Sequence, residues 1–173
     1  MTETAAAVAL STLLLPELEA ELKRTRRILD ALPEDQPGFK PHEKSKTLDK
    51  LAGHTAEIPA LGWIILTTPS LDATAPGNPR KTVVMESKAQ LLAEFDFNAA
   101  RLVDTLKQTT DESFHEPWSL ARGEFKIFSG LRYDAYRTFC LNHMIHHRAQ
   151  LGCYIRDLNL TLPGTYGPSA DGM

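Results

Sequence analysis

The chain has 173 residues, of which 42% are hydrophobic and 24% charged, and its formal net charge is −3. This length fits one domain over residues 1–173, which can bury roughly two-thirds of its unfolded surface without a disulfide framework. The composition argues against a nucleic-acid binder, because such proteins carry a clear basic excess. It also argues against a membrane protein, since no run approaches the ~20 apolar residues that span a bilayer.

The N-terminus and the two cysteines both predict a cytoplasmic protein. No basic region precedes the Ala-rich stretch that follows Met1, and Pro16 interrupts the apolar residues after it, so no signal peptide is expected. Cys140 and Cys153 fall in one predicted helix and point to different sides of it, which disfavours a disulfide within the chain. Free cysteines suit a reducing compartment.

Four segments carry apolar residues at helical spacing and predict amphipathic helices. They cover residues 13–32, 48–66, 87–108 and 131–158. Four helices of about 20 residues, each with one apolar stripe, pack by default as a four-helix bundle. The fold class is therefore predicted as all-α.

The segments between the predicted helices are long. Residues 33–45 contain three prolines and one glycine, and residues 69–79 are rich in proline, glycine and asparagine, so both are expected to be irregular. The second of these is a long crossover between the second and third helices. Residues 109–130 lose the helical period, and the polar–apolar alternation from Glu124 to Phe128 allows a short strand or hairpin before the fourth helix.

Three of the six histidines fall where apolar residues are expected. His143 and His147 are four residues apart on the apolar stripe of the fourth helix, and His54 replaces the apolar residue expected between Leu51 and Ile58. Burying an imidazole without a partner costs free energy, and a shared metal ion removes that cost. The pattern favours a metal site made of these three histidines over three separate hydrogen-bonded core histidines.

The other histidines are not expected to be ligands. His42 and His115 lie in predicted loops, where a surface position is the simpler interpretation. His146 turns toward the polar side of the fourth helix, so it is either exposed or behind the ligands.

The fourth helix also resembles a known family. The segment LNHMIHHRAQL at residues 141–151 is similar to the signature helix of the DinB superfamily, and the likeness continues to PGTYGPSAD at 163–171. Upstream, LAGHTAE at 51–57 fits the second helix of the same family. The family signature typically has glycine where this chain has Ala149, a small change.

The resemblance carries several expectations. It implies a four-helix bundle with a long crossover after the second helix, and a divalent metal site whose ligands are His54, His143 and His147. It also implies a homodimer. Some members of the family are metal-dependent thiol S-transferases or isomerases that use small-molecule thiols, and many others have no known activity.

Two interpretations of the function follow. Zinc or nickel held by three imidazoles keeps open positions, as in catalytic sites, and can activate a thiol or a water in a transferase or hydrolase reaction on a small molecule. Glu57, one turn after His54, is then the candidate general base, although it can instead orient a ligand ring or simply lie on the surface. The alternative is a non-enzymatic metal-binding stress-response protein whose site stabilises the fold.

Three further residues lie near the predicted ligands in the sequence. Asn142 and Arg148 flank the ligands and could bind a substrate carboxylate, but solvated helix faces are the simpler interpretation for both. Cys140, three residues before His143, is the candidate that could close the site as a fourth ligand.

Overall fold

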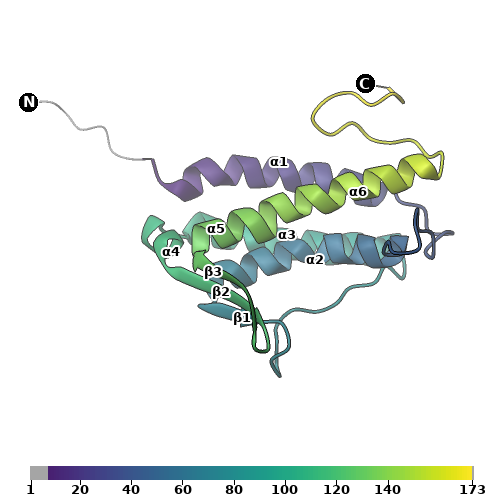
Figure 1. The fold of residues 1–173 in the computed structure, drawn as a ribbon. Helices are drawn as coiled ribbons and strands as arrows, with labels where there is room; N and C mark the ends of the chain where they lie inside the picture. Colours follow the sequence, from purple (N-terminus) through teal and green to yellow (C-terminus); the bar gives the residue numbers. More distant parts are fainter. Residues whose placement is uncertain (1–7, 173) are drawn as a thin grey trace, which may run out of the picture.

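The computed structural model describes residues 8–172, and four long helices pack against one another in it (Figure 1). They are α1 (Leu10–Asp30), α2 (Leu48–Thr67), α3 (Lys88–Gln108) and α6 (His143–Asp157). Both α1 and α2 pack against α3 and α6, so α1 and α2 occupy opposite corners of the bundle. The predicted four-helix bundle, with a long crossover between α2 and α3, is confirmed.

The predicted apolar stripes form the core of the bundle. In α1 the buried side chains recur every three or four residues, as at Leu14, Leu18 and Leu22. Helix α3 begins where the Ser87 hydroxyl accepts a hydrogen bond from the backbone N–H of Gln90, an N-cap arrangement. Within the described residues, no helix combines the length and the apolar character needed to cross a bilayer.

The fourth predicted helix is not one continuous α-helix. Instead of a single helix over 131–158, the chain forms α5 (Arg132–Tyr136), the π-helical turn η1 (Arg137–Asn142) and then α6. A π-helical turn bonds residue i to residue i+5 and is often found near functional sites. Buried residues at four-residue spacing are compatible both with an α-helix and with a single π turn. The spacing of apolar residues in the sequence therefore does not reveal the π-helical turn.

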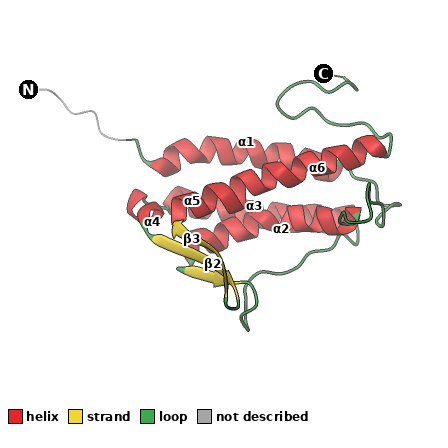
Figure 2. Ribbon diagram, in the orientation of Figure 1, coloured by secondary structure: helices red, strands yellow, loops and turns green. Residues whose placement is uncertain are grey.

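A small sheet lies at one end of the bundle (Figure 2). Strands β2 (Pro117–Arg122) and β3 (Phe125–Leu131) form an antiparallel hairpin, whose turn contains Gly123 at a φ of 60°. That left-handed conformation favours glycine. The hairpin allowed by the alternation from Glu124 to Phe128 is therefore present, and it is longer than that segment.

Two short elements escape the sequence prediction. Strand β1 (Ser70–Asp72) lies in the crossover expected to be irregular, and it pairs in parallel with β2, with Leu71 opposite Leu120. Helix α4 (Asp111–His115) lies in the region without helical period. Pairing between distant segments leaves no local signal, and a single helical turn is too short to show a period.

Arg132 joins the sheet end to the bundle. Its Nη1 donates hydrogen bonds to the carbonyl oxygens of Ile65 and Thr68, at 2.6 and 2.7 Å, and its Nη2 pairs with Glu116 at 2.7 Å. The last carbonyls of a helix have no partner inside the helix, so this buried guanidinium caps the C-terminal end of α2.

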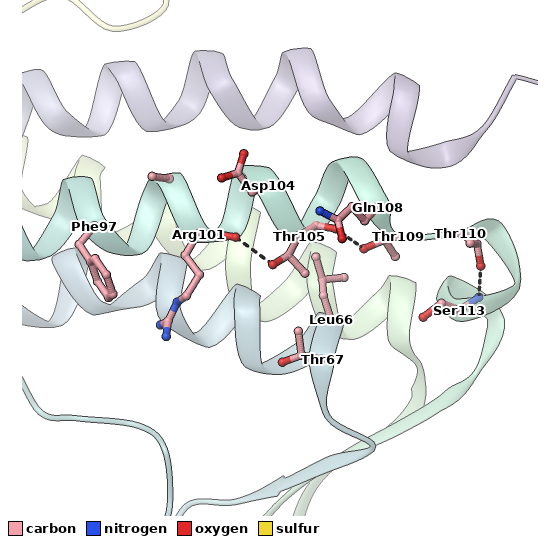
Figure 3. Close-up of a pocket in the computed structure, with 11 residues that line it drawn as sticks. Leu66, Thr67, Phe97, Arg101, Asp104, Thr105, Gln108, Thr109, Thr110 and Ser113 are labelled. Carbon is pink, nitrogen blue, oxygen red and sulfur yellow. Dashed lines mark hydrogen bonds between the residues drawn. The ribbon is translucent and has the colours of Figure 1, made fainter.

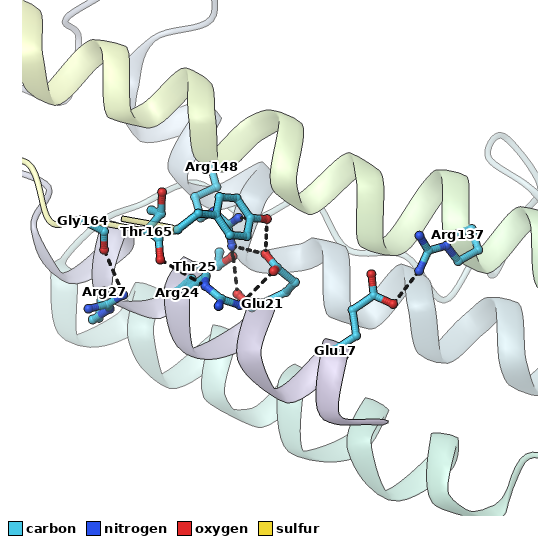
Figure 4. A network of polar contacts seen from close by, with 10 residues as sticks. Glu17, Glu21, Arg24, Thr25, Arg27, Arg137, Arg148, Gly164 and Thr165 are labelled. Carbon is cyan, nitrogen blue, oxygen red and sulfur yellow. Dashed lines mark hydrogen bonds and ion pairs between the residues drawn. The ribbon is translucent and has the colours of Figure 1, made fainter. Parts of the chain in front are cut away.

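A second buried arginine joins α1, α6 and the C-terminal tail (Figure 4). Arg148 is 2% exposed; its guanidinium pairs with the Glu21 carboxylate at 2.6 Å and donates to the Tyr166 hydroxyl at 2.7 Å and the Thr25 hydroxyl at 3.3 Å. We call these four residues the Arg148 cluster. The expectation that Arg148 lies on a solvated helix face is wrong, and its donors are already occupied by the protein.

Candidate metal centre

Three histidines from two helices meet inside the bundle. His54 comes from α2, His143 is the first residue of α6, and His147 follows one turn later. The Nε2 atom of His143 is 3.3 Å from Nε2 of His54 and 2.8 Å from Nε2 of His147. One ring nitrogen from each histidine lies within 4.8 Å of the other two. The three residues selected from the sequence are thus brought together.

Side chains three residues farther along each helix hold the opposite nitrogen of two rings. His54 Nδ1 lies 2.6 Å from Glu57 Oε1, and His147 Nδ1 lies 2.7 Å from Gln150 Oε1. An oxygen acceptor at Nδ1 makes that nitrogen the N–H donor and leaves Nε2 with a free lone pair. In the neutral form of both rings, the unprotonated nitrogen is therefore Nε2, which lies on the side of the cluster.

The ring of His143 is held differently. Its Nδ1 is buried and has no partner of good hydrogen-bond geometry among the described residues. The backbone of Phe139 is close enough to act in favour of the protonated ring, but this effect is smaller than those that lower the pKa of His143. No side chain competes for the Nε2 of this ring apart from the other two histidines. His143 is thus the central member of the cluster.

The spacing of the three Nε2 atoms suits one ion. Nitrogen lone pairs at these distances repel one another unless a proton or a cation lies between them. An ion about 2.0–2.1 Å from each nitrogen separates them by roughly 2.9 Å at a right angle and roughly 3.3 Å at the tetrahedral angle. Two of the three separations, 2.8 and 3.3 Å, match these values, and the third pair, His54 and His147, lies within 4.8 Å. Three imidazole nitrogens gathered in this way are a donor set that suits a divalent metal ion.

Burial keeps two of the rings neutral. Desolvation is the largest cause that lowers the pKa of His143 to about 4, with the neighbouring rings of His147 and His54 adding to it. Desolvation likewise lowers the pKa of His147 to about 4, against an opposing effect of the Gln150 hydrogen bond; Lys46 adds a smaller lowering effect. Neutral imidazole is the form that binds a metal ion.

Glu57 is a fully engaged carboxylate. Burial raises its pKa, but hydrogen bonds from His54 and Arg80 and the positive charge of Arg80 outweigh that effect, so that the pKa of Glu57 is lowered overall. Arg80 Nη2 donates to Glu57 Oε1 at 2.6 Å; its 3.3 Å approach to His54 Nδ1 is secondary, because that nitrogen is itself a donor. The backbone N–H of Val83 also reaches Glu57 Oε2 at 3.4 Å. This geometry matches a group that orients a ligand ring.

A cavity borders the cluster on one side. It has a volume of about 460 Å³, and its walls include His147 and Gln150. The His54 side chain is 16% exposed, so the cluster is not sealed from solvent. Another cavity, of about 630 Å³, lies along α3 near Phe97 and Arg101 and touches none of the three histidines (Figure 3). Of these two cavities, the first is the one that adjoins the histidine cluster.

The remaining histidines lie outside the cluster. His42, His115 and His146 are exposed, as expected, although His115 belongs to the short helix α4 and not to a loop. The ring of His146 stands 4.8 Å from that of His147, measured between ring centroids, so it is a neighbour of a ligand. Asn142 is exposed, in agreement with a solvated helix face.

Cys140 does not join the three histidines. It is fully buried, and among the described residues the group that could share an ion contains the three histidines alone. Its Sγ packs on α2 where a Cβ on Gly62 would come within 2.5 Å of it. Burial raises the pKa of the Cys140 thiol to about 12, which disfavours the thiolate that a metal ligand needs. Both cysteines are free, as predicted.

Sequence reasoning missed two residues of the centre. Gln150 stands in the same i+3 relation to His147 as Glu57 does to His54, and that repeated spacing could have identified it. Arg80 comes from the crossover, and nothing local in the sequence links it to Glu57. Gly53 explains how the crossover comes so close, since a Cβ at this position would collide with the Val83 carbonyl.

Known proteins share this fold. A 2.01 Å crystal structure of a DinB-like protein from Bacillus cereus ATCC 10987 superposes with a TM-score of 0.67 at 20% identity, covering 91% of this chain and 98% of that one. YfiT from Bacillus subtilis, described as a probable metal-dependent hydrolase with an unusual four-helix bundle topology, gives a TM-score of 0.65 at 13% identity, covering 92% and 94%. At these identities the likeness concerns the fold alone.

Sequence comparison identifies the family. The uncharacterized protein YrdA of Bacillus subtilis strain 168 is 28% identical over 159 residues, which is 91% of this chain and 88% of YrdA. The model of the DinB family matches residues 1–173, the whole chain. The chain therefore belongs to the DinB family.

Proposed function

We propose that this protein binds one divalent metal ion, zinc or nickel, through the Nε2 atoms of His54, His143 and His147. The observation that carries the proposal is the convergence of these nitrogens while Glu57 and Gln150 occupy the Nδ1 atoms of two rings. Imidazole nitrogen is a ligand that both metals accept well. The hydrogen-bonded partners that fix the tautomer are a regular feature of histidine metal sites.

The proposed activity is hydrolysis, or transfer of a thiol, on a small molecule. An ion with three protein ligands retains open positions and lowers the pKa of a water or a thiol that occupies one of them. The cavity beside His147 supports this function, because it gives a small molecule a place next to one of the three proposed ligands. The description of the DinB-like protein YfiT as a probable metal-dependent hydrolase points the same way.

Within this proposal, Glu57 orients His54 and does not act as the general base. Its Oε1 accepts hydrogen bonds from both His54 and Arg80, so taking a proton from substrate would require it to give up one of them. A bound ion would supply acidity to a water or thiol, and with Glu57 engaged in this way the proton released would go to solvent or to a group of the substrate. The carboxylate contributes by keeping the His54 ring in its metal-binding tautomer.

The second candidate is a metal-binding protein without enzymatic activity, in which the ion only stabilises the fold. The burial of His147, which is 8% exposed, favours it. The two candidates differ in whether small molecules reach the ion.

The metal content of protein prepared without a histidine tag tests the site. We expect about one ion per chain by elemental analysis. His54→Ala, His143→Ala and His147→Ala should each reduce that content to below about a tenth, whereas the exposed His42→Ala and His115→Ala should leave it unchanged. Full occupancy in His54→Ala would remove α2 from the site.

Cobalt substitution separates the two candidates. Thiolate bound to cobalt gives a near-ultraviolet charge-transfer band that imidazole and water do not give. Under the enzymatic candidate, the cobalt protein lacks this band until a small thiol is added. A band that is present from the start and is lost in Cys140→Ser would make the site closed and structural, and a spectrum that no added thiol changes would favour the structural candidate.

We also propose a homodimer, by analogy with the family, and a cytoplasmic location, which the two free cysteines support. Light scattering at micromolar concentration should then give a mass near twice the chain mass of 19.2 kDa. A mass near 19.2 kDa would refute the dimer, and recovery outside the cytoplasm in fractionated cells would refute the location.

A further inference from the structure

The cavity beside His147 has a distinctive set of charges. It lies between α6 and the loop that leads into α2, and its lining includes Lys44 and Lys46 from that loop and Gln150 and Tyr154 from α6. No aspartate or glutamate lines it. Its volume of about 460 Å³ falls within the range typical of small-molecule sites.

The two lysines have no protein partner that neutralises them. Among the described residues, neither side chain takes part in an ion pair. Lys40, in the same loop, differs because its Nζ donates to the Glu43 carbonyl. The ammonium groups of Lys44 and Lys46 are therefore free to bind a ligand.

The loop that carries these lysines is fixed independently of their charges. The Tyr154 hydroxyl donates to the Lys46 carbonyl at 2.8 Å, and the backbone N–H groups of Lys44 and Ser45 bond to Nδ1 and the carbonyl oxygen of His42. These contacts involve backbone atoms, so they do not require the ammonium groups. Replacing both lysines by glutamine should leave the loop in place.

The metal centre adds no negative charge on this side. Imidazole side chains carry no negative charge, and the carboxylate next to the three histidines, Glu57, is paired with Arg80. A bound divalent ion makes the region more positive still. A cavity with two free ammonium groups next to a cation favours an anionic occupant.

We propose that the substrate of this site is a small carboxylate-bearing molecule, whose carboxylate is bound by Lys44 and Lys46 while its reacting group faces the ion. This inference rests on the proposed function, since it concerns the same site. It adds the class of substrate: an anion, in preference to a neutral or cationic molecule.

The test uses the cobalt-loaded full-length protein and two matched thiols, 6-mercaptohexanoate and its neutral amide. Both place a thiol at the ion, and only the acid carries a negative charge at the other end. Dissociation constants come from titration of the cobalt–thiolate band. We expect the acid to bind about fivefold more tightly than the amide, as suits two exposed ion pairs.

The variant Lys44→Gln/Lys46→Gln should abolish this preference by weakening the acid about fivefold and changing the amide less than twofold. Lys50→Gln is the matched control, because Lys50 is exposed on α2 and does not line the cavity, and it should retain the preference. Raising the salt concentration should reduce the preference in the wild type and in Lys50→Gln, and should have little effect on the double lysine variant.

The outcomes separate the two proposals. Equal binding of acid and amide by the wild type, or an unchanged preference in the double lysine variant, would overturn the anionic substrate and leave the metal site standing. Failure to take up cobalt, with the circular dichroism of a folded protein, would overturn the proposed function itself.

Discussion

Two polar clusters lie on consecutive residues of α6 and differ in how completely the protein satisfies them. Arg148 is surrounded by the Glu21 carboxylate and two hydroxyl groups, so its charge and its donors are matched inside the molecule. His147, next to it in the chain, has one nitrogen matched by Gln150, and its other nitrogen lies 2.8 Å from Nε2 of His143, which in turn is 3.3 Å from Nε2 of His54.

A structural polar cluster can be distinguished from a functional one by whether the protein itself satisfies every buried polar group. Buried polar groups that only hold a fold together find partners within it. The histidine cluster gathers three imidazole nitrogens within 4.8 Å of one another, and among the described residues these nitrogens contact only each other on that side. A cation between them would complete the cluster, whereas the Arg148 cluster needs no such group.

The largest expected effect comes from breaking the Arg148 cluster. Glu21→Ala leaves the Arg148 charge buried without its partner and should lower the free energy of unfolding by about 3–5 kcal/mol. Glu17→Ala, which removes the partly exposed partner of Arg137, is the control and should cost about 0.2–1 kcal/mol. Urea denaturation measures both. Similar losses in the two variants would mean that the Arg148 cluster is no more important than a surface pair.

A smaller effect is expected at the metal centre from Glu57→Ala. Loss of the carboxylate frees Nδ1 of His54 and should weaken metal binding by about 10- to 100-fold, the usual effect of removing a group that orients a ligand. Competition with a chromophoric chelator gives the affinity. Unchanged affinity would show that the tautomer of His54 is fixed without Glu57.

Gln150→Ala should weaken metal binding less than Glu57→Ala. The amide oxygen of Gln150 is a neutral acceptor, and a hydrogen bond to a charged acceptor is roughly twice as strong. The two variants are compared in the same chelator competition. A larger loss in Gln150→Ala would reverse the assignment of the more important orienting group.

A change of pH is the mildest perturbation. The folded pKa values of His143 and His147, about 4, lie below the ordinary value of 6.5, so the unfolded chain binds more protons between these limits. The metal-free protein should therefore lose stability as the pH falls from about 6.5 toward 4. Denaturation at pH 6.5 and 5 measures this loss, and His143→Ala/His147→Ala should reduce it. A wild-type stability that does not fall would contradict the neutral buried rings.

Helical periodicity was sufficient to predict the bundle and the convergence of His54, His143 and His147. Regular spacing of leucines marks each buried stripe, and a histidine in such a stripe stands out because its neighbours, such as Leu51 and Ile58, are apolar. The hairpin before α5 also has a local signal, namely the alternation that continues through β3.

The structural features that the sequence did not predict depend on contacts between segments far apart in the chain. Strand β1 exists because β2 lies beside it, and Arg80 reaches Glu57 from a crossover without periodicity. In the sequence, Arg148 looks like an exposed polar residue. Its partners are far from it along the chain, because Glu21 belongs to α1 and Tyr166 to the C-terminal tail. Such partners can be named only when the packing is known.

The π-helical turn η1 gives this segment a tolerance at the level of the gene. A turn closed by i→i+5 bonds holds one residue more than an α-helical turn, so α5 and α6 face the bundle much as the parts of one regular helix would. Loss of one codon from residues 137–139 would let α5 and α6 join as a regular α-helix, with Arg132 still near the end of α2 and His143 still near His54. A single-codon deletion here should be far less harmful than one inside α2 or α3, where each residue lost turns the rest of the helix by about 100°.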